Sequence, residues 1–168
     1  MIKIAFIGPE SSGKSTLALM LSKKLNCILV SEYSREYLAT KQNYSLDDLN
    51  KIAKGQRKKL EKNSKKKGKY LISDTCLLDI EIWSEVKFKT LNPEIRIMSK
   101  AERFDIFFLC KPDIPWEEDP LRENPKNREL LYYKFQEKLI NREIDYFEVE
   151  GKIENRLSFC LDIILRNK

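Results

Sequence analysis

Histidine is missing from this chain of 168 residues. Its absence excludes Ser-His-Asp and Cys-His nucleophilic mechanisms, because both need an imidazole as the base. Acid–base chemistry would therefore fall to carboxylates, lysines or water. The four cysteines lie far apart without a Cys-x-x-Cys pair, so a structural zinc site is not expected. The apolar neighbours of each cysteine instead predict small buried side chains.

Long apolar runs are also missing. No run approaches the ~20 residues that a helix needs to cross a bilayer. The apolar start is too short for the core of a signal peptide and belongs to the first predicted strand. We therefore expect a cytoplasmic protein with no membrane partner. With 42% hydrophobic and 35% charged residues, the chain is typical of a globular protein, and its length predicts a single domain over residues 1–168.

Positive charge is in excess and is concentrated in one stretch. The net charge is +6, and seven lysines crowd residues 58–69: Lys58, Lys59, Lys62, Lys65, Lys66, Lys67 and Lys69. A solvated helix end that runs into a surface loop is the ordinary explanation, and binding of nucleic acid or of an acidic partner is the other. No aromatic residues are interleaved with these lysines, so nucleic-acid binding is not expected.

One motif organises the chain: Gly8-Pro9-Glu10-Ser11-Ser12-Gly13-Lys14-Ser15. It matches G-x-x-x-x-G-K-[ST], a loop whose backbone N–H groups surround nucleotide phosphates. We predict that this loop, together with Thr16, binds ATP. Lys14 would act on the β- and γ-phosphates, and the hydroxyl of Ser15 would bind Mg²⁺. The two glycines allow backbone angles that turn successive amides towards the anion.

The surroundings of this motif support it. An apolar run at residues 2–7 precedes it, and Leu17, Leu21 and Leu25 follow at helical spacing. Strand, loop and helix in this order are the context that the motif requires.

Further apolar runs alternate with helical patterns along the chain. The predicted strands cover residues 2–7, 27–30, 70–73, 105–110 and 146–149. Helices are predicted between them, including one capped by Ser45 and Asp48, one beginning at Pro93 and one from about Pro125. The alternation predicts an α/β fold with three αβα layers and a five-stranded parallel sheet, as in P-loop NTPases of the nucleoside- and nucleotide-kinase type. Ligands of such sheets bind beyond the carboxyl ends of the strands.

Two carboxylates follow predicted strands at that end of the sheet. Asp74 ends the third strand, where P-loop proteins place the acid that holds Mg²⁺, although it could instead cap the helix that follows. Glu32 ends the second strand and is a candidate base or hydroxyl-positioning residue, or else the start of a surface helix. The sequence leaves open which of the two is the base. Arg35, one turn further on, could hold a substrate or pair with Glu32.

A loop rich in proline is predicted at residues 111–128, because four of the six prolines lie between positions 112 and 125. We predict that it acts as a lid. Arg122 is the candidate cation that covers the ATP phosphates when the lid closes, and Arg128 is a second choice. An ordinary surface arginine is the alternative for either. Trp116 could stack on a base or anchor the loop.

Together these stretches resemble the ribosylnicotinamide kinase domain of NadR-type proteins and their stand-alone relatives, which are grouped as NadR-like AAA ATPases. The matching segments are residues 8–15, 32–37, 55–57, 74–75 and 116–122. The resemblance implies ATP-dependent phosphorylation of a ribonucleoside 5′-hydroxyl, with residues 116–122 as the lid. The residues that we assign to catalysis are Lys14, Glu32, Asp74 and Arg122. Those that we assign to the substrate site are Glu32, Tyr33, Arg35, Gln56 and Trp116.

Two departures from the family concern the acceptor. Aromatic side chains hold the nicotinamide ring in the family, but this chain has Ser31 before the Glu-Tyr pair. It also lacks an aromatic residue at positions 58–61, after the Gln-Arg pair. Nicotinamide riboside is therefore the first of several acceptors to consider. An ATP-binding switch without a small-molecule acceptor is the alternative. A guanine-nucleotide switch is less favoured, because Asn-Lys-x-Asp and Asp-x-x-Gly motifs are missing. A motor fragment is less favoured, because 168 residues are too few for a second motor module.

Overall fold

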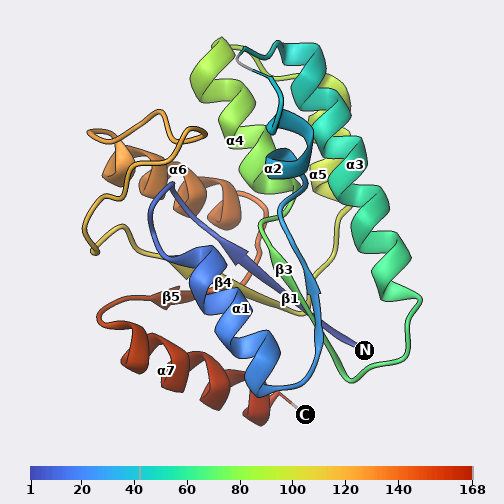
Figure 1. Ribbon diagram of the computed structural model, residues 1–168, viewed down its shortest axis with the longest axis vertical. Coiled ribbons are helices and arrows are strands. Elements are labelled where there is room, and N and C mark those ends of the chain that lie inside the picture. Colours follow the sequence, from blue (N-terminus) through green and yellow to red (C-terminus); the bar gives the residue numbers. More distant parts are fainter. Residues whose placement is uncertain (42, 168) are drawn as a thin grey trace.

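The computed structural model describes residues 1–41 and 43–167. Its sheet is all-parallel, with the strand order β2-β3-β1-β4-β5 (Figure 1). The strands are β1 (Ile2–Ile7), β2 (Ile28–Val30), β3 (Tyr70–Asp74), β4 (Ile106–Cys110) and β5 (Phe147–Val149). The predicted α/β fold with five parallel strands is therefore confirmed. Three of the strands, β2, β4 and β5, begin one residue later than predicted.

Helices cover both faces of the sheet (Figure 1). They are α1 (Lys14–Lys24), α2 (Tyr33–Leu38), α3 (Leu46–Ser64), α4 (Leu77–Phe88), α5 (Pro93–Ala101), α6 (Arg128–Ile140) and α7 (Ile153–Arg166). One face is covered by α1 and α7, and the other by α4 and α6, with α3 and α5 packed against α4. In the described part of the chain, no helix combines the length and the apolar character needed to span a membrane.

The central strand β1 carries the core on both of its faces. Ile4 and Phe6 pack with side chains of α1 and α7, whereas Ala5 and Ile7 pack with those of α4 and α6. Successive side chains of a strand point to opposite faces, so a strand covered on both sides is apolar at every one of these positions. All four residues are fully buried, and the turn that follows β1 is therefore held on a rigid support.

Most helix starts agree with the sequence. Ser45 and Asp48 form the predicted capping box, in which the Asp48 carboxylate accepts a hydrogen bond of 2.9 Å from the Ser45 amide. The helix predicted from about Pro125 begins instead at Arg128. Residues 124–127 form a turn, in which the Asn127 amide donates to the Asn124 carbonyl at 3.3 Å. This turn adds to the loop that precedes α6.

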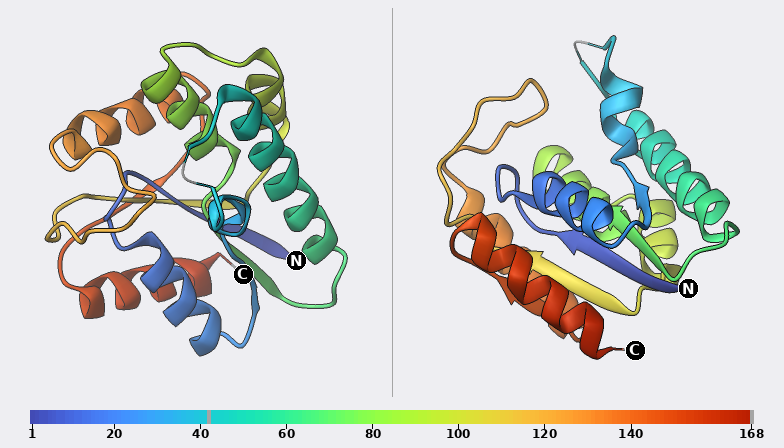
Figure 2. Two further views of the ribbon diagram at one scale, coloured as in Figure 1. Left: turned by 45° about the horizontal axis from the view of Figure 1, so that its top comes forward. Right: turned by 60° about the horizontal axis from the view of Figure 1, so that its bottom comes forward.

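That loop, residues 111–127, is called the lid loop below. It joins β4 to α6 and stands beside the turn between β1 and α1, with α2 on the other side of the turn (Figure 2). Residues 58–69 lie at the far end of α3 and in the turn after it, where six of the seven lysines are exposed. Cys76, Cys110 and Cys160 are buried as predicted, whereas Cys27 is half-buried because it precedes the edge strand β2.

Candidate active site

The turn between β1 and α1 has the backbone geometry that a phosphate-binding loop requires. Gly8 has a φ of 134°, and a Cβ at this position would lie 2.7 Å from the carbonyl oxygen of Cys110 at the end of β4. Gly13 has a φ of 81° and precedes the first residue of α1. The amides at the start of α1 therefore face the loop, where they favour an anion.

Lys14 lies across this loop. Its ammonium donates hydrogen bonds to the carbonyl oxygens of Gly8 at 2.5 Å and of Pro9 at 2.8 Å. These contacts hold the positive charge at the mouth of the loop. A lysine at this position of the motif is the one that reaches the β- and γ-phosphates of a nucleotide.

Asp74 lies at the end of β3, next to β1 and close to Ser15. Its carboxyl is buried, and its Oδ1 atom has no hydrogen-bond partner among the described residues. Burial raises the pKa of Asp74, while the neighbouring Ser15 hydroxyl acts to lower it. Asp74 does not cap the next helix, because the N-cap of α4 is Cys76. A buried carboxylate oxygen without a partner, beside a serine hydroxyl, fits the oxygen ligands that Mg²⁺ and its bound water require.

The residue after Asp74 has a strained backbone. Thr75 has a φ of 79°, which β-branched residues rarely adopt. Its amide donates to the carbonyl of Phe6 at 3.0 Å, so the strained turn is tied to β1. Such strain is found mainly at functional sites. No sequence pattern indicates it, because threonine is an ordinary residue at the end of a strand.

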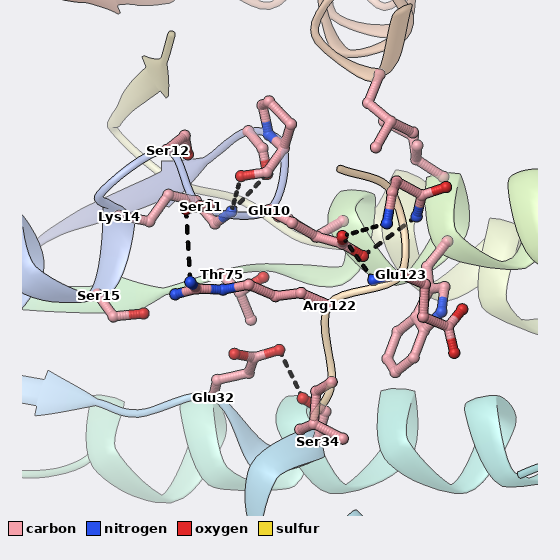
Figure 3. Close-up of a pocket in the computed structure, with 18 of the residues that line it drawn as sticks. Glu10, Ser11, Ser12, Lys14, Ser15, Glu32, Ser34, Thr75, Arg122 and Glu123 are labelled. Atoms are coloured by element: carbon pink, nitrogen blue, oxygen red, sulfur yellow. Dashed lines mark hydrogen bonds between the residues drawn. The ribbon is translucent and has the colours of Figure 1, made fainter. Parts of the chain in front are cut away.

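Glu32 points into the same space from the opposite side (Figure 3). It precedes α2, but its carboxylate makes no capping hydrogen bond to the backbone. Instead it accepts a hydrogen bond of 2.5 Å from the Ser34 hydroxyl and pairs with Arg35 at 3.3 Å. Arg35 also pairs with Asp119 of the lid loop at 2.9 Å. Arg35 thus forms the ion pair with Glu32 that was one of its two predicted roles, and it also connects α2 to the lid loop.

Arg122 reaches from the lid loop to the phosphate-binding loop. Its guanidinium lies 3.4 Å from the Ser11 hydroxyl (Figure 3) and also donates to the carbonyl of Glu117. Arg128 lies at the base of the lid loop, where it donates to the carbonyl oxygens of Ser11 at 3.0 Å and Ile114 at 2.9 Å. Both arginines thus contact Ser11, but of the two only Arg122 lines the cavity formed by the described residues.

A cavity of about 250 Å³ is lined by several of these groups, although not by Asp74 or Arg128. Its polar lining includes the whole loop from Gly8 to Thr16 together with Glu32, Arg35 and Arg122. Its apolar lining comes from α4, the lid loop and α6: Ile80, Ile82, Trp83, Val86, Ile114, Leu121, Leu131 and Phe135. The sequence analysis missed Trp83, because the helical apolar spacing of α4 indicates only a face that packs on the core.

Three residues predicted at the substrate do not line this cavity within the described ranges: Tyr33, Gln56 and Trp116. Gln56 is buried, and its side-chain oxygen accepts a hydrogen bond of 2.8 Å from the Tyr33 amide. Gly55 leaves room for the Tyr33 ring, since a Cβ there would lie 2.1 Å from it. Gly55 and Gln56 therefore hold Tyr33, the first residue of α2, and with it the preceding residue Glu32. Direct substrate contact by these residues remains a prediction.

Trp116 makes one contact with α6 and one within the lid loop. The Arg128 guanidinium lies over its ring at 5.8 Å from the centroid, and its indole N–H donates to Glu118 at 2.9 Å. These contacts favour the second of the two roles predicted from the sequence, in which Trp116 anchors the loop.

A buried arginine also supports the phosphate-binding loop. Arg156 of α7 is 2% exposed and donates to the carbonyl oxygens of Ser12 at 2.8 Å and Gly151 at 2.7 Å. It also pairs with Asp113 of the lid loop. The sequence analysis missed this residue, because an arginine among the apolar residues of an amphipathic helix is indistinguishable from one on the solvent side.

Acidic groups gather where α4 begins, and one of them, Asp79, lines the cavity. Glu102 accepts a hydrogen bond of 2.8 Å from the Leu77 amide. Its other neighbours are Asp79 of α4, the N-cap residue Cys76 and Arg57 of α3. Burial raises the pKa of Glu102 to about 7 and that of Asp79 to about 6. Both carboxyls are therefore more easily protonated in the folded chain than in the unfolded chain.

This difference predicts how stability depends on pH. Because both pKa values are raised, the stabilisation from protonated Glu102 and Asp79 is complete below their unfolded values and is lost as the pH rises through about 6 to 7. The Glu102→Gln variant keeps an oxygen for the Leu77 amide but cannot ionise. Between roughly pH 5 and pH 8, we therefore expect the free energy of unfolding to fall by about 1–3 kcal/mol more in the parent than in this variant. Urea unfolding at a series of pH values measures this, and parallel curves for the two proteins would contradict it.

Comparisons with known proteins give consistent matches. The family model of the AAA domain matches residues 3–156. The trifunctional NAD biosynthesis/regulator proteins NadR of Salmonella typhimurium strain LT2 and Escherichia coli strain K12 are each 28% identical over 124 residues. That alignment covers 71% of this chain and 30% of each relative, so the chain spans well under half the length of these relatives.

Solved structures agree with the fold. A NadR protein in complex with NR matches with a TM-score of 0.83 and 21% identity, over 97% of this chain and 50% of that one. Deoxyadenosine kinase from M. mycoides matches with a TM-score of 0.67 and 17% identity, over 98% and 100%. Shikimate kinase from Acinetobacter baumannii matches with a TM-score of 0.62 and 15% identity, over 100% and 95%. The resemblance to NadR-type proteins stated from the sequence is confirmed.

Proposed function

This chain belongs to the AAA domain family, and we propose that it is an ATP-dependent kinase that phosphorylates the 5′-hydroxyl of a ribonucleoside. One arrangement carries the proposal. The phosphate-binding loop, the cation of Arg122 and the carboxylate of Glu32 line a single cavity. A switch that binds and hydrolyses ATP could also use a carboxylate to position water, but it needs no apolar recess for an acceptor beside its phosphate loop.

The proposed reaction uses these groups in turn. The acceptor hydroxyl oxygen attacks the γ-phosphorus of ATP, the bond from that phosphorus to the β–γ bridging oxygen breaks, and ADP leaves. The hydroxyl proton passes to Glu32, which we favour over Asp74 as the base because Glu32 lines the cavity and Asp74 is buried beside Ser15. Lys14 and Arg122 stabilise the charge on the transferring group, and positioning supplies much of the remaining rate.

The residues also fit a magnesium ion. Ser15 and Asp74 would hold Mg²⁺, Asp74 through a bound water, and the ion would neutralise charge on the ATP phosphates. The orphaned Oδ1 atom of Asp74 supports this assignment.

Nicotinamide riboside is the acceptor that we put first. The NadR relatives are named for NAD biosynthesis, and a NadR protein has been solved in complex with NR. The two positions without aromatic residues face each other here, because the Lys59 ammonium donates to the Ser31 hydroxyl at 2.7 Å. A planar ring would therefore need another apolar wall, and Trp83 and Leu121 are cavity-lining residues that could supply one.

An acceptor panel tests the proposal. We expect nicotinamide riboside or another ribonucleoside to raise ADP release from ATP and Mg²⁺ at least about tenfold over a blank without acceptor, because a bound hydroxyl competes better than water for the phosphoryl group. The matched 5′-deoxyribonucleoside, which has no attacking oxygen, should give only the blank rate. ADP release that no member of the panel increases would contradict the kinase and favour the ATP-binding switch.

A further inference from the structure

The side chain of Glu10 faces away from the phosphate-binding loop to which it belongs. Its Oε2 atom accepts hydrogen bonds from two successive amides of the lid loop, those of Glu123 and Asn124, both at 2.9 Å. Its Oε1 atom accepts a third, of 3.2 Å, from the side-chain amide of Asn124. Figure 3 shows these bonds joining Glu10 to the lid loop.

The two amides held in this way follow directly after Arg122. A carboxylate bound by two adjacent backbone N–H groups and a side-chain amide fixes the direction of the chain as well as its distance. The Arg122 guanidinium in turn lies 3.4 Å from the hydroxyl of Ser11, the neighbour of Glu10. The side chain of Glu10 and that of Arg122 therefore connect the same two loops from opposite sides.

The Ser11 hydroxyl also joins the two loops, because it accepts a hydrogen bond of 3.0 Å from the Glu117 amide, five residues before Arg122. Other contacts of the lid loop lead to helices. Asp119 pairs with Arg35 of α2, and the Glu123 carboxylate pairs with Lys87 of α4 and accepts a hydrogen bond of 2.9 Å from Tyr44. Arg128 contacts the phosphate-binding loop at the base of the lid loop, several residues beyond Arg122. Glu10 is thus the residue of the phosphate-binding loop that binds the lid loop directly after Arg122.

We propose that Glu10 is a positioning residue, which holds Arg122 over the nucleotide phosphates by binding the two lid-loop amides that follow it. This proposal rests on the proposed kinase function. It assigns to the Glu10 side chain a role separate from that of its backbone N–H, which remains part of the phosphate-binding loop. A shift of the order of 1 Å in a charge-stabilising group is enough to lower a rate about 100-fold.

Hydrogen–deuterium exchange tests the attachment without any activity. In the Glu10→Ala variant, we expect the amides of residues 123 and 124 to exchange at least about tenfold faster, while those of β4 stay unchanged, because only the former lose their acceptor. The Glu129→Gln variant is the matched control, since this exposed carboxylate near the lid loop makes no hydrogen bond or ion pair among the described residues. Unchanged exchange at residues 123 and 124 would overturn the proposal.

Kinetics test the consequence. With the acceptor that is active in the panel, Glu10→Ala should lower kcat about 10- to 100-fold, while the Kd for ATP changes less than about threefold. In a variant that already carries Arg122→Ala, adding Glu10→Ala should lower kcat little further, because the guanidinium that Glu10 positions is no longer there. Losses that multiply in the double variant, or an unchanged kcat with faster exchange, would overturn the positioning role. If no acceptor is active, the kinase proposal fails, and the exchange measurement still decides whether Glu10 holds the lid loop.

Discussion

Replacing Lys14 by alanine is expected to lower kcat for phosphoryl transfer by a factor of at least about 1,000, which corresponds to about 4 kcal/mol of transition-state stabilisation. The Lys14 ammonium sits at the mouth of the phosphate-binding loop, held by two backbone carbonyls of that loop. Lys87, the other lysine among the described residues that line the cavity, comes from α4 and pairs with Glu123. ADP release with the active acceptor measures the effect.

Lys24→Ala is the matched control for this prediction. Lys24 lies in the last turn of the same helix, is exposed, and should change neither turnover nor stability. Thermal melts of both variants exclude unfolding as the cause of a loss. Full activity in Lys14→Ala would contradict the assignment of this loop to ATP.

Replacing Asp74 by asparagine is expected to lower kcat about 100- to 1,000-fold and to raise the Mg²⁺ concentration that gives half-maximal rate. Asparagine keeps the shape of the side chain but removes the negative charge that would hold the ion beside Ser15. A titration of Mg²⁺ at saturating ATP separates weaker metal binding from a general loss of activity.

Asp162→Asn provides the comparison for Asp74. Asp162 forms an exposed ion pair with Arg166 within α7, and such pairs contribute little to stability. We expect its Mg²⁺ dependence to match that of the parent. An Asp74→Asn variant with the same Mg²⁺ dependence as the parent would show that Asp74 has no role at the metal.

Much of the architecture could be predicted because its signals are local. The strand–loop–helix order around Lys14 identifies the loop, and parallel strands bring their carboxyl ends to one edge of the sheet. Glu32 and Asp74 were therefore expected near the loop, and in the structure Glu32 lines the cavity while Asp74 lies beside Ser15. The lid loop followed from its prolines, which exclude a helix interior.

The rest depends on contacts between residues far apart in the chain. Glu10 meets residues 123 and 124, and Arg156 meets Ser12, across more than a hundred positions. No spacing rule links such pairs, and each residue is ordinary in its own segment. The start of α6 was predicted too early because proline is well tolerated in the first turn of a helix. A turn stabilised by Asn124 determines the actual boundary.

The buried Arg156 has a consequence for the molecule as a whole. One guanidinium joins the final helix to the loop at the other end of the sequence, through the carbonyl of Ser12. We expect a ligand that orders this loop to favour the packed state of α7 as well. Loosening α7 should then weaken the binding of that ligand by the same free energy, because coupling between two sites is reciprocal. The two ends of the chain thus form one thermodynamic unit.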